Sequence, residues 1–435
     1  MQSLLDFDLK HILHPCSQMK DYEWLKPLLI QKAEGAYFYT QDGKKVIDAI
    51  SSWWCKSFGH QHPRLKRALL QQLDHFEHVI FANTTNEVIV QLTQQLLKLM
   101  PHLSHVFYAG DGSCAVEVAM KMSLHTRYVA GEKKKTQFMA LLNSYHGETM
   151  GALSVSDLDL YKTPYQSALF DVYFIQSIPY VTGSDDPLWH DCSEIWPKIE
   201  IELLNRVDIT TAILVEPIVQ GAGGMKIYSP DFLKRLARFA KEHHIHLIAD
   251  EIMTGLGRTG KLLACQYANI EPDIVCLAKG LTGGWLPFSA ILFTDEINQY
   301  FYGDFASSKS FLHSHTYSGN VMGAAIAREV LHLLQEDDCL QRINTMGERM
   351  RFLMQEIADQ TGKLQDVRQL GAIVAADIKN VCRNRPLYRV FQEALKQGAF
   401  LRPLGQTLYW MPPFITTDAT LLELQAITES ALRVV

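Results

Sequence analysis

The sequence lacks the marks of several large classes of protein. Its 8 cysteines include no C-x-x-C pair, which argues against a disulfide framework and favours reduced, buried thiols. No apolar run is long enough to span a bilayer, and the N-terminal stretch MQSLLDFDLKHILHP has no signal-peptide core. A net charge of -6 gives no electrostatic reason to bind nucleic acid. We therefore expect a cytoplasmic protein that binds neither nucleic acid nor membranes.

What the chain does contain is an alternation of two kinds of segment. Short apolar runs rich in β-branched residues predict buried strands at 105–109, 211–217, 245–250, 273–278 and 288–294. Amphipathic stretches such as SPDFLKRLARFAKEHH lie between several of these runs, and Ser229 at its start is a good helix cap. Continuously apolar strands separated by helices indicate a mostly parallel sheet covered on both faces. The predicted fold class is therefore α/β.

The length of 435 residues favours two or three domain-sized units. We expect a large sheet domain at 61–330 and a smaller α+β domain at 331–435, with residues 1–60 packed on the smaller one. The final part restarts with DVRQLGAIVAADI and ends in the helical pattern DATLLELQAITESALRVV. The irregular stretch at 177–194 is interpreted as an excursion from the large domain.

A turn from strand to helix at AGDGS predicts a place for an anion. Gly110 and Gly112 let backbone N–H groups face a ligand, the helix N-terminus favours negative charge, and Ser113 adds a hydroxyl donor. A phosphate group suits this place. The alternative is a plain turn in which Ser113 caps the helix.

Two further residues follow strands that are expected to end at the same edge of the sheet. Asp250, followed by Glu251, comes directly after IHLIA, and Lys279 comes directly after DIVCLA. Ligands of open α/β sheets bind at this edge. A partly desolvated lysine there becomes a usable nucleophile and base. A phosphate cradle, an acid and an amine together meet the needs of pyridoxal phosphate.

Aromatic and histidine side chains complete the set of candidates. Tyr145, followed by His146, lies in a glycine-containing turn where it could stack on a planar ring, although a place at the edge of the core is the alternative. His313 and His315 form an H-x-H pair, and three more histidines lie at 243, 244 and 246. Neither group has cysteines or the spacing of a closed zinc site, so no metal is expected.

Five motifs in this order, DGS, SYHG, ADEIMTGLGRTG, AKGLTGG and HTYSGN, resemble those of the class-III pyridoxal-phosphate aminotransferases. The resemblance covers nearly the whole chain. It implies the fold-type I architecture, with a large domain of mostly parallel sheet that binds the cofactor and a smaller α+β domain. It also implies a homodimer whose active sites are shared between the subunits.

The resemblance assigns roles to the residues of these motifs. Lys279 forms a Schiff base with pyridoxal phosphate and moves protons, and Asp250 pairs with the pyridinium nitrogen. Gly112 and Ser113 bind the phosphate, and Tyr145 stacks near the ring. The remaining cofactor contacts come from the HTYSGN segment, where Thr316, with His315 beside it, reaches the phosphate of the other subunit.

Three other stretches, HILHPCSQM, SSWWCKSFGHQHP and LRPLGQTLYWMPPF, resemble one branch of this class. Members of this branch transfer an amino group from S-adenosyl-L-methionine to 8-amino-7-oxononanoate, giving 7,8-diaminononanoate for biotin synthesis by a ping-pong mechanism. The implied substrate-binding residues are Cys16, Trp53, Trp54, Tyr145, Lys279, Ser314 and Arg402. Cys16, Glu148 and His315 stand where the family commonly has tyrosine, aspartate and proline.

Three alternatives remain on this scaffold. The enzyme could take lysine as donor or be a general ω-amino acid aminotransferase. A regulator that binds the cofactor without turnover usually carries a DNA-binding region, and no basic helix-turn-helix is recognisable in the sequence. A lyase or racemase is disfavoured by the tandem tryptophans.

Overall fold

The computed structural model describes residues 3–379 and 385–435. Its strands are β1 (Ile30–Glu34), β2 (Tyr37–Thr40), β3 (Lys45–Asp48), β4 (His105–Ala109), β5 (Gln137–Leu141), β6 (Val172–Ile175), β7 (Tyr180–Val181), β8 (Thr210–Val215), β9 (Val219–Gln220), β10 (Lys226–Tyr228), β11 (His246–Asp250), β12 (Ile274–Leu277), β13 (Ser289–Phe293), β14 (Leu364–Leu370), β15 (Ile373–Ile378), β16 (Ala399–Phe400) and β17 (Thr407–Trp410).

The α-helices are α1 (Leu4–His11), α2 (Ser51–Trp54), α3 (Pro63–Leu73), α4 (Glu87–Leu97), α5 (Gly112–Ala130), α6 (Met150–Ser154), α7 (Asp159–Lys162), α8 (Pro187–His190), α9 (Trp196–Leu204), α10 (Pro230–Glu242), α11 (Asp295–Phe301), α12 (Val321–Leu334), α13 (Cys339–Thr361), α14 (Pro386–Gln397) and α15 (Asp418–Leu432). Short 3-10 helices are η1 (Met19–Glu23), η2 (Thr163–Ala168), η3 (Ala264–Tyr267), η4 (Lys279–Thr282) and η5 (Phe305–Ser307). None of the helices in these two ranges combines the length and the apolar character that a bilayer-crossing segment needs.

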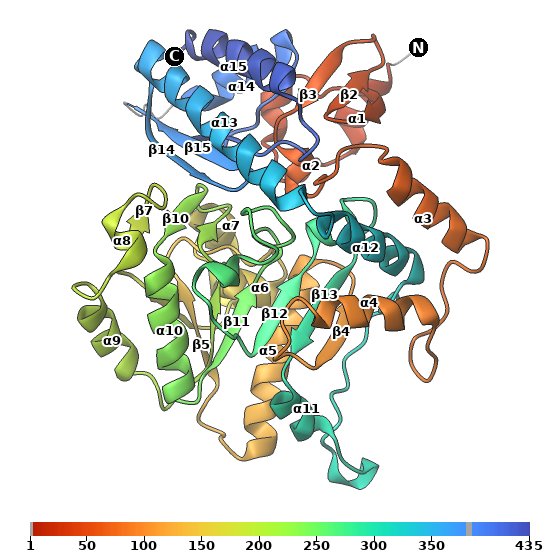
Figure 1. Ribbon diagram of the computed structural model, residues 1–435, viewed down its shortest axis with the longest axis vertical. Coiled ribbons are helices and arrows are strands. Elements are labelled where there is room, and N and C mark those ends of the chain that lie inside the picture. Colours follow the sequence, from red (N-terminus) through yellow and green to blue (C-terminus); the bar gives the residue numbers. More distant parts are fainter. Residues whose placement is uncertain (1–2, 380–384) are drawn as a thin grey trace.

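A seven-stranded sheet with the order β4-β13-β12-β11-β8-β5-β6 forms the centre of the lower part of the molecule (Figure 1). Only β13 runs antiparallel to its neighbours β12 and β4, and the other pairs are parallel. All five predicted strands are present, and β8, β11, β12 and β13 are buried along their whole length. The expected mostly parallel sheet is therefore confirmed.

Side chains on the two faces of this sheet enter two different apolar clusters. In β8, for example, Ile213 and Val215 belong to one cluster, and Ala212 and Leu214 belong to the other. Helix α10 covers the first face with the predicted apolar stripe, which includes Leu233, Leu236 and Phe239. Helix α5 covers the second face. Because both faces are covered, the strands are apolar without alternation.

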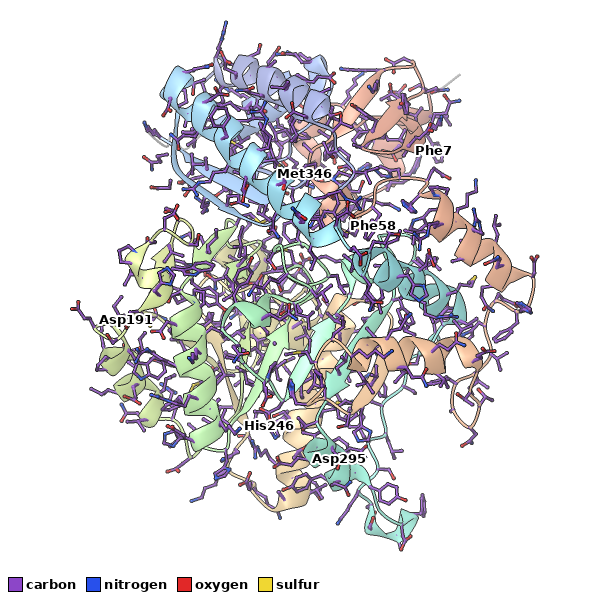
Figure 2. The ribbon with its side chains drawn as sticks, in the orientation of Figure 1. Phe7, Phe58, Asp191, His246, Asp295 and Met346 are labelled. Atoms are coloured by element: carbon purple, nitrogen blue, oxygen red, sulfur yellow. The ribbon has the colours of Figure 1, made fainter. Side chains whose placement is uncertain are left out.

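The upper part of the molecule contains both ends of the chain (Figure 1). The N-terminal strands β1, β2 and β3 form one sheet with β16, in which Ile47 pairs with Ala399 and Asp48 with Phe400. Strands β14, β15 and β17 form a second sheet. Figure 2 places Phe58 near the boundary of the upper and lower parts, and its ring centroid lies 5.6 Å from that of Phe414. The division at 60/61 and 330/331 stays a prediction.

The cysteines follow the sequence prediction only in part. Seven are free, and the four at 192, 265, 276 and 339 are buried as expected. Cys55 and Cys114 are half-buried, and the prediction of a buried thiol is wrong for Cys16, which is exposed. Cys16 lies between α1 and η1, in the N-terminal segment before the first strand. The eighth cysteine, Cys382, lies outside the described residues.

Candidate active site

A cavity of about 450 Å³ opens at the carboxyl edge of the central sheet. Figure 2 shows His246 at the lower end of β11, so Asp250 at the other end faces the upper part of the molecule. Glu216 follows β8, and Lys279 follows β12 after Ala278. These three side chains line the cavity, because parallel neighbouring strands end at one edge. The expected meeting of Asp250 and Lys279 in one crevice is observed.

Asp250 is held in one orientation by its neighbours. Its Oδ2 lies 2.8 Å from Nδ1 of His146, and its Oδ1 accepts the backbone N–H of Ile252 at 3.1 Å. Both Asp250 and His146 are buried. Because a carboxylate only accepts, this contact places the proton of the imidazole on Nδ1. The other ring nitrogen, Nε2, has no hydrogen-bond partner among the described residues.

The carboxylate of Glu251, the neighbouring acid, is bound by groups of the protein itself. Its carboxylate accepts the hydroxyl of Thr254 at 2.6 Å and the backbone N–H groups of Ala264 and Cys265 at 3.0 and 2.7 Å. It does not line the cavity. Of the two adjacent acids at the end of β11, Asp250 alone faces the candidate site.

Lys279 begins η4 with a backbone φ of 45°, a left-handed conformation that a residue with a side chain adopts at a cost. Burial lowers the pKa of its amine, and the negative charges of Asp250 and Glu216 oppose this shift in part. The Nζ atom lies 4.9 Å from the ring centroid of Trp54. An amine in this setting loses its proton more readily than one in water.

Glu216 is a site residue that the sequence analysis missed. It is buried, and burial raises the pKa of its carboxyl to about 7. Its two oxygens accept the backbone N–H groups of Tyr145 and Gly221, each at 2.9 Å. The signal that identified Asp250, an acid directly after a buried strand, is also present at the end of TAILVEP and could have identified Glu216.

The turn before α5 has the form of an anion cradle. Asp111, and not Ser113, caps the helix by accepting the N–H of Cys114 at 2.9 Å, so the alternative of a serine cap is wrong. The Oγ of Ser113 accepts the N–H of Glu148 at 3.1 Å. Gly147 has a φ of +127°, and a Cβ there would lie 2.0 Å from that oxygen. A larger residue at 147 would therefore close the space beside the Ser113 hydroxyl.

A polar cluster at one side of the cavity contains Tyr145 and two residues that depart from the family pattern. The hydroxyl of Tyr145 donates to Oε1 of Glu148 at 2.8 Å, and Sγ of Cys16 lies 3.7 Å from the same oxygen. The guanidinium of Arg402 donates to the backbone carbonyl of Cys16 and stacks 4.9 Å from the ring centroid of Trp53. This cluster joins the N-terminal segment to the loop after β5 and to the C-terminal part of the chain.

The tandem tryptophans enter two different cavities. Residues Ser51–Trp54, labelled α2, have φ values of 50°, 45°, 68° and 73°, which is a left-handed turn. Trp54 lines the Lys279 cavity and donates its indole N–H to the hydroxyl of Tyr409 at 3.0 Å. Trp53 is 40% exposed and lines a neighbouring cavity of about 460 Å³ together with Arg402.

The structure does not bring the HTYSGN residues to this cavity within one chain. Ser314 and Thr316 are exposed, and His315 contacts His313, with 2.9 Å between their Nε2 atoms. His78 bonds the backbone carbonyl of Thr316 at 3.0 Å. None of the residues from 313 to 316 lines the Lys279 cavity. Within residues 3–379 and 385–435, no group of three or more histidine, cysteine or acidic side chains could hold a metal ion.

The residues present fit pyridoxal phosphate. Gly112 and Ser113 offer donors at a helix N-terminus, Asp250 offers a buried carboxylate, and Lys279 offers an amine on the same cavity. The buried Nε1 of Trp285, another lining residue, has no hydrogen-bond partner in the described chain. A polar ligand could satisfy this donor, which an apolar one could not.

The family model described as aminotransferase class-III matches residues 19–432. The chain belongs to the class-III aminotransferases. It is therefore a transaminase of the α/β fold class that the sequence predicted, and its substrates are small molecules.

Relatives of this aminotransferase are found among curated proteins and solved structures. It is 36% identical over 425 residues to the adenosylmethionine-8-amino-7-oxononanoate aminotransferase of Helicobacter pylori, covering 96% of this chain and 94% of the relative. The protein of that name from Synechococcus elongatus is 37% identical over 427 residues, with 96% and 97% covered. The crystal structure of the Methanocaldococcus jannaschii protein of that name superimposes with a TM-score of 0.91 at 31% identity, with 99% and 98% covered. An amine transaminase from an uncultivated Pseudomonas species, solved in its PLP-bound internal aldimine form, gives a TM-score of 0.89 at 28% identity, with 97% and 98% covered.

Proposed function

We propose that this aminotransferase uses pyridoxal phosphate to transfer an amino group from S-adenosyl-L-methionine to 8-amino-7-oxononanoate, giving 7,8-diaminononanoate for biotin synthesis. The observation that carries the proposal is the placement of Lys279, Asp250 and the cradle at Ser113 around one cavity. The shared name of eight curated relatives, 32–37% identical over 96% of the chain, supports the choice of substrates. The cytoplasm is the proposed location.

The residues around the cavity have different roles in such a reaction. When bound, pyridoxal phosphate supplies an electron sink for the charge that develops at the donor's α-carbon. Asp250, oriented by His146, would hold a proton on the ring nitrogen of the cofactor, and Gly112 and Ser113 would bind its phosphate. Lys279 would provide the amine that holds the aldehyde of the cofactor, and the same amine would accept and return the proton of the donor's α-carbon. The lowered pKa of this amine favours both of its tasks.

Substrate recognition is proposed for the polar cluster and the two tryptophans. The indole rings of Trp53 and Trp54 offer cation–π contact to a sulfonium and apolar contact to an aliphatic chain. The guanidinium of Arg402 suits the carboxylate of the keto acid. Tyr145 and Cys16, which both contact Glu148, complete the wall on this side.

We further propose a homodimer in which one subunit completes the site of the other. The exposure of Ser314 and Thr316, away from the cavity of their own chain, supports this arrangement. In it, Thr316 and His315 would reach the phosphate in the partner subunit, and Ser314 would lie on the path of the substrate. The division of each chain at 60/61 and 330/331 belongs to the same proposal.

One assay tests the choice of donor. The purified holoenzyme is given 8-amino-7-oxononanoate together with S-adenosyl-L-methionine, lysine or 4-aminobutyrate, and 7,8-diaminononanoate is measured by mass spectrometry. Product with S-adenosyl-L-methionine alone is the expected result. Product with lysine alone would show that lysine is the donor, and product with 4-aminobutyrate alone would overturn the assignment in favour of an ω-amino acid aminotransferase.

A further inference from the structure

The left-handed turn at Ser51–Trp54 is an unusual conformation for its sequence. All four residues have positive φ, and none is a glycine, the residue that adopts this region without steric penalty. A run of such residues persists only where surrounding contacts determine it. The contacts that hold this turn therefore decide where the two tryptophans point.

Two of these contacts come from one buried carboxylate, that of Asp48. Oδ1 of Asp48 accepts the backbone N–H of Ser52 at 2.8 Å, and Oδ2 accepts the hydroxyl of Ser52 at 2.7 Å. Nε2 of His60 lies 2.9 Å from the same Oδ2. Asp48 is 0% exposed, so its charge is unscreened and the hydrogen bonds to it are strong. On the other side of the turn, Ser51 donates to the carbonyl of Met411 at 2.7 Å.

The turn positions both rings relative to charged groups. The Trp54 centroid lies 4.9 Å from Nζ of Lys279, and the Trp53 centroid lies 4.9 Å from the guanidinium carbon of Arg402. The direction of the Trp53 side chain depends on the backbone angles of Ser52 and Trp53, which are φ 45°, ψ 55° and φ 68°, ψ 47°. The two stacking contacts depend on the backbone between them.

We propose that Asp48 is a positioning residue for substrate binding. Together with His60, it holds the left-handed turn, and through the turn it places Trp53 under Arg402 and Trp54 over Lys279. The inference rests on the proposed function, because the two tryptophans must line the path of the substrates for their placement to matter. Asp48 touches neither the Lys279 cavity nor the cofactor cradle, so its effect is expected on substrate affinity and not on cofactor binding.

The test compares Asp48→Ala with Asp273→Ala. Asp273 is a half-buried carboxylate that also accepts a backbone N–H, from Leu247 at 2.7 Å, but it lies at the opposite end of the sheet from the cavity. Asp48→Ala is expected to raise KM for donor and acceptor by about tenfold or more, with kcat and cofactor content little changed. Asp273→Ala is expected to lower stability with KM unchanged. Equal KM values for wild type and Asp48→Ala, or the same rise in Asp273→Ala, would overturn the proposal.

A second pair of variants separates the turn from general stability. Asp48→Asn keeps an oxygen for the N–H of Ser52, and its KM values are expected to lie between those of the wild type and of Asp48→Ala. The double variant Asp48→Ala/Ser52→Gly puts at 52 a residue that needs no help to keep a positive φ. It is expected to recover part of the lost affinity, and no recovery in either variant contradicts the role of the turn. These two variants carry the test if Asp48→Ala does not fold.

A measurement on the apo protein needs no turnover. The near-ultraviolet circular dichroism of the tryptophans is expected to change in Asp48→Ala and to return toward wild type in the double variant, while Asp273→Ala keeps the wild-type spectrum. An unchanged spectrum in Asp48→Ala would reject the positioning role. Wild type is assayed first with each donor: inactivity of wild type with all of them contradicts the proposed function, whereas the spectra decide about Asp48 separately.

Discussion

The imidazole of His146 and the carboxylate of Asp250 form a buried pair, with 2.8 Å between Nδ1 and Oδ2. One residue comes from the loop after β5 and the other from the end of β11. The pair fixes both the direction of the carboxylate and the tautomer of the ring. Neither property follows from the Asp250 side chain alone.

Replacing Asp250 is expected to lower the rate more than replacing His146 does. Asp250→Asn removes the negative charge proposed to face the ring nitrogen and should lower kcat by about a hundredfold or more. His146→Ala leaves the charge but frees its orientation, with an expected loss of roughly tenfold. Steady-state kinetics of both variants at equal cofactor occupancy measures the order, and a larger loss in His146→Ala would contradict it.

Lys279→Ala is expected to abolish covalent attachment of the cofactor and both half-reactions. The visible absorbance of the holoenzyme should disappear, and intact mass after borohydride reduction should show no added cofactor. Lys135→Ala is a matched control, since burial also lowers the pKa of Lys135, which bonds the carbonyl of His244 far from the cavity. Retained turnover in Lys279→Ala would refute the assigned site.

Glu216 is expected to make stability depend on pH. Its pKa is raised by burial from 4.5 to about 7, so the folded apo protein binds the proton more tightly than the unfolded chain does. The stabilisation is therefore complete below pH 4.5 and is lost as pH rises to about 7, in total roughly 3 kcal/mol. Urea unfolding of the apo protein at pH 5 and pH 8 measures this loss. The Glu216→Gln variant, whose side chain does not titrate, should lose less stability between pH 5 and pH 8. An equal loss in the variant and the wild type would show that another group titrates.

Arg402 is expected to act on the acceptor that carries a carboxylate. Arg402→Ala should raise KM for 8-amino-7-oxononanoate by roughly tenfold to a hundredfold, with cofactor binding retained. Arg402→Lys keeps the charge but loses the planar fork and the stacking on Trp53, and should recover little. Initial rates over a range of acceptor concentrations distinguish the variants, and full recovery by lysine would show that charge alone matters.

The proposed sharing of sites can be tested by mixing two inactive chains. If Thr316 serves the partner's site, a mixed dimer of Lys279→Ala and Thr316→Ala chains contains one site with both wild-type residues. Co-expression with two different tags, followed by tandem purification, should then give activity well above that of either variant alone. No gain over the Thr316→Ala homodimer would assign Thr316 to its own chain.

The sequence predicted the position of a site residue where that residue directly follows a buried strand. Asp250 and Lys279 could be placed together because each follows a buried strand, and parallel strands end at one edge. Glu216 satisfies the same rule and was missed only because no motif drew attention to it. The sequence analysis considered only Ser113 as the cap of α5, whereas the geometry of the turn gives that role to Asp111, which is also a good capping residue.

Other features depend on contacts between distant parts of the chain and leave no local signal. Ser-Ser-Trp-Trp contains no glycine, so nothing in it predicts a left-handed turn; Asp48, His60 and Met411 impose it. The contact of Cys16 with Glu148 likewise joins two separate segments. Local propensity cannot report such contacts, since they form only when the whole chain is folded.

The pairing of β3 with β16 has a consequence for how the protein is made. Residues 30–48 leave the ribosome long before β16, the strand that pairs with β3, and before Arg402, which stacks on Trp53. The edge of β3 therefore stays unpaired until β16 has been synthesised. An unpaired strand edge favours aggregation. We expect chains truncated before residue 399 to need chaperones more than chains that contain β16.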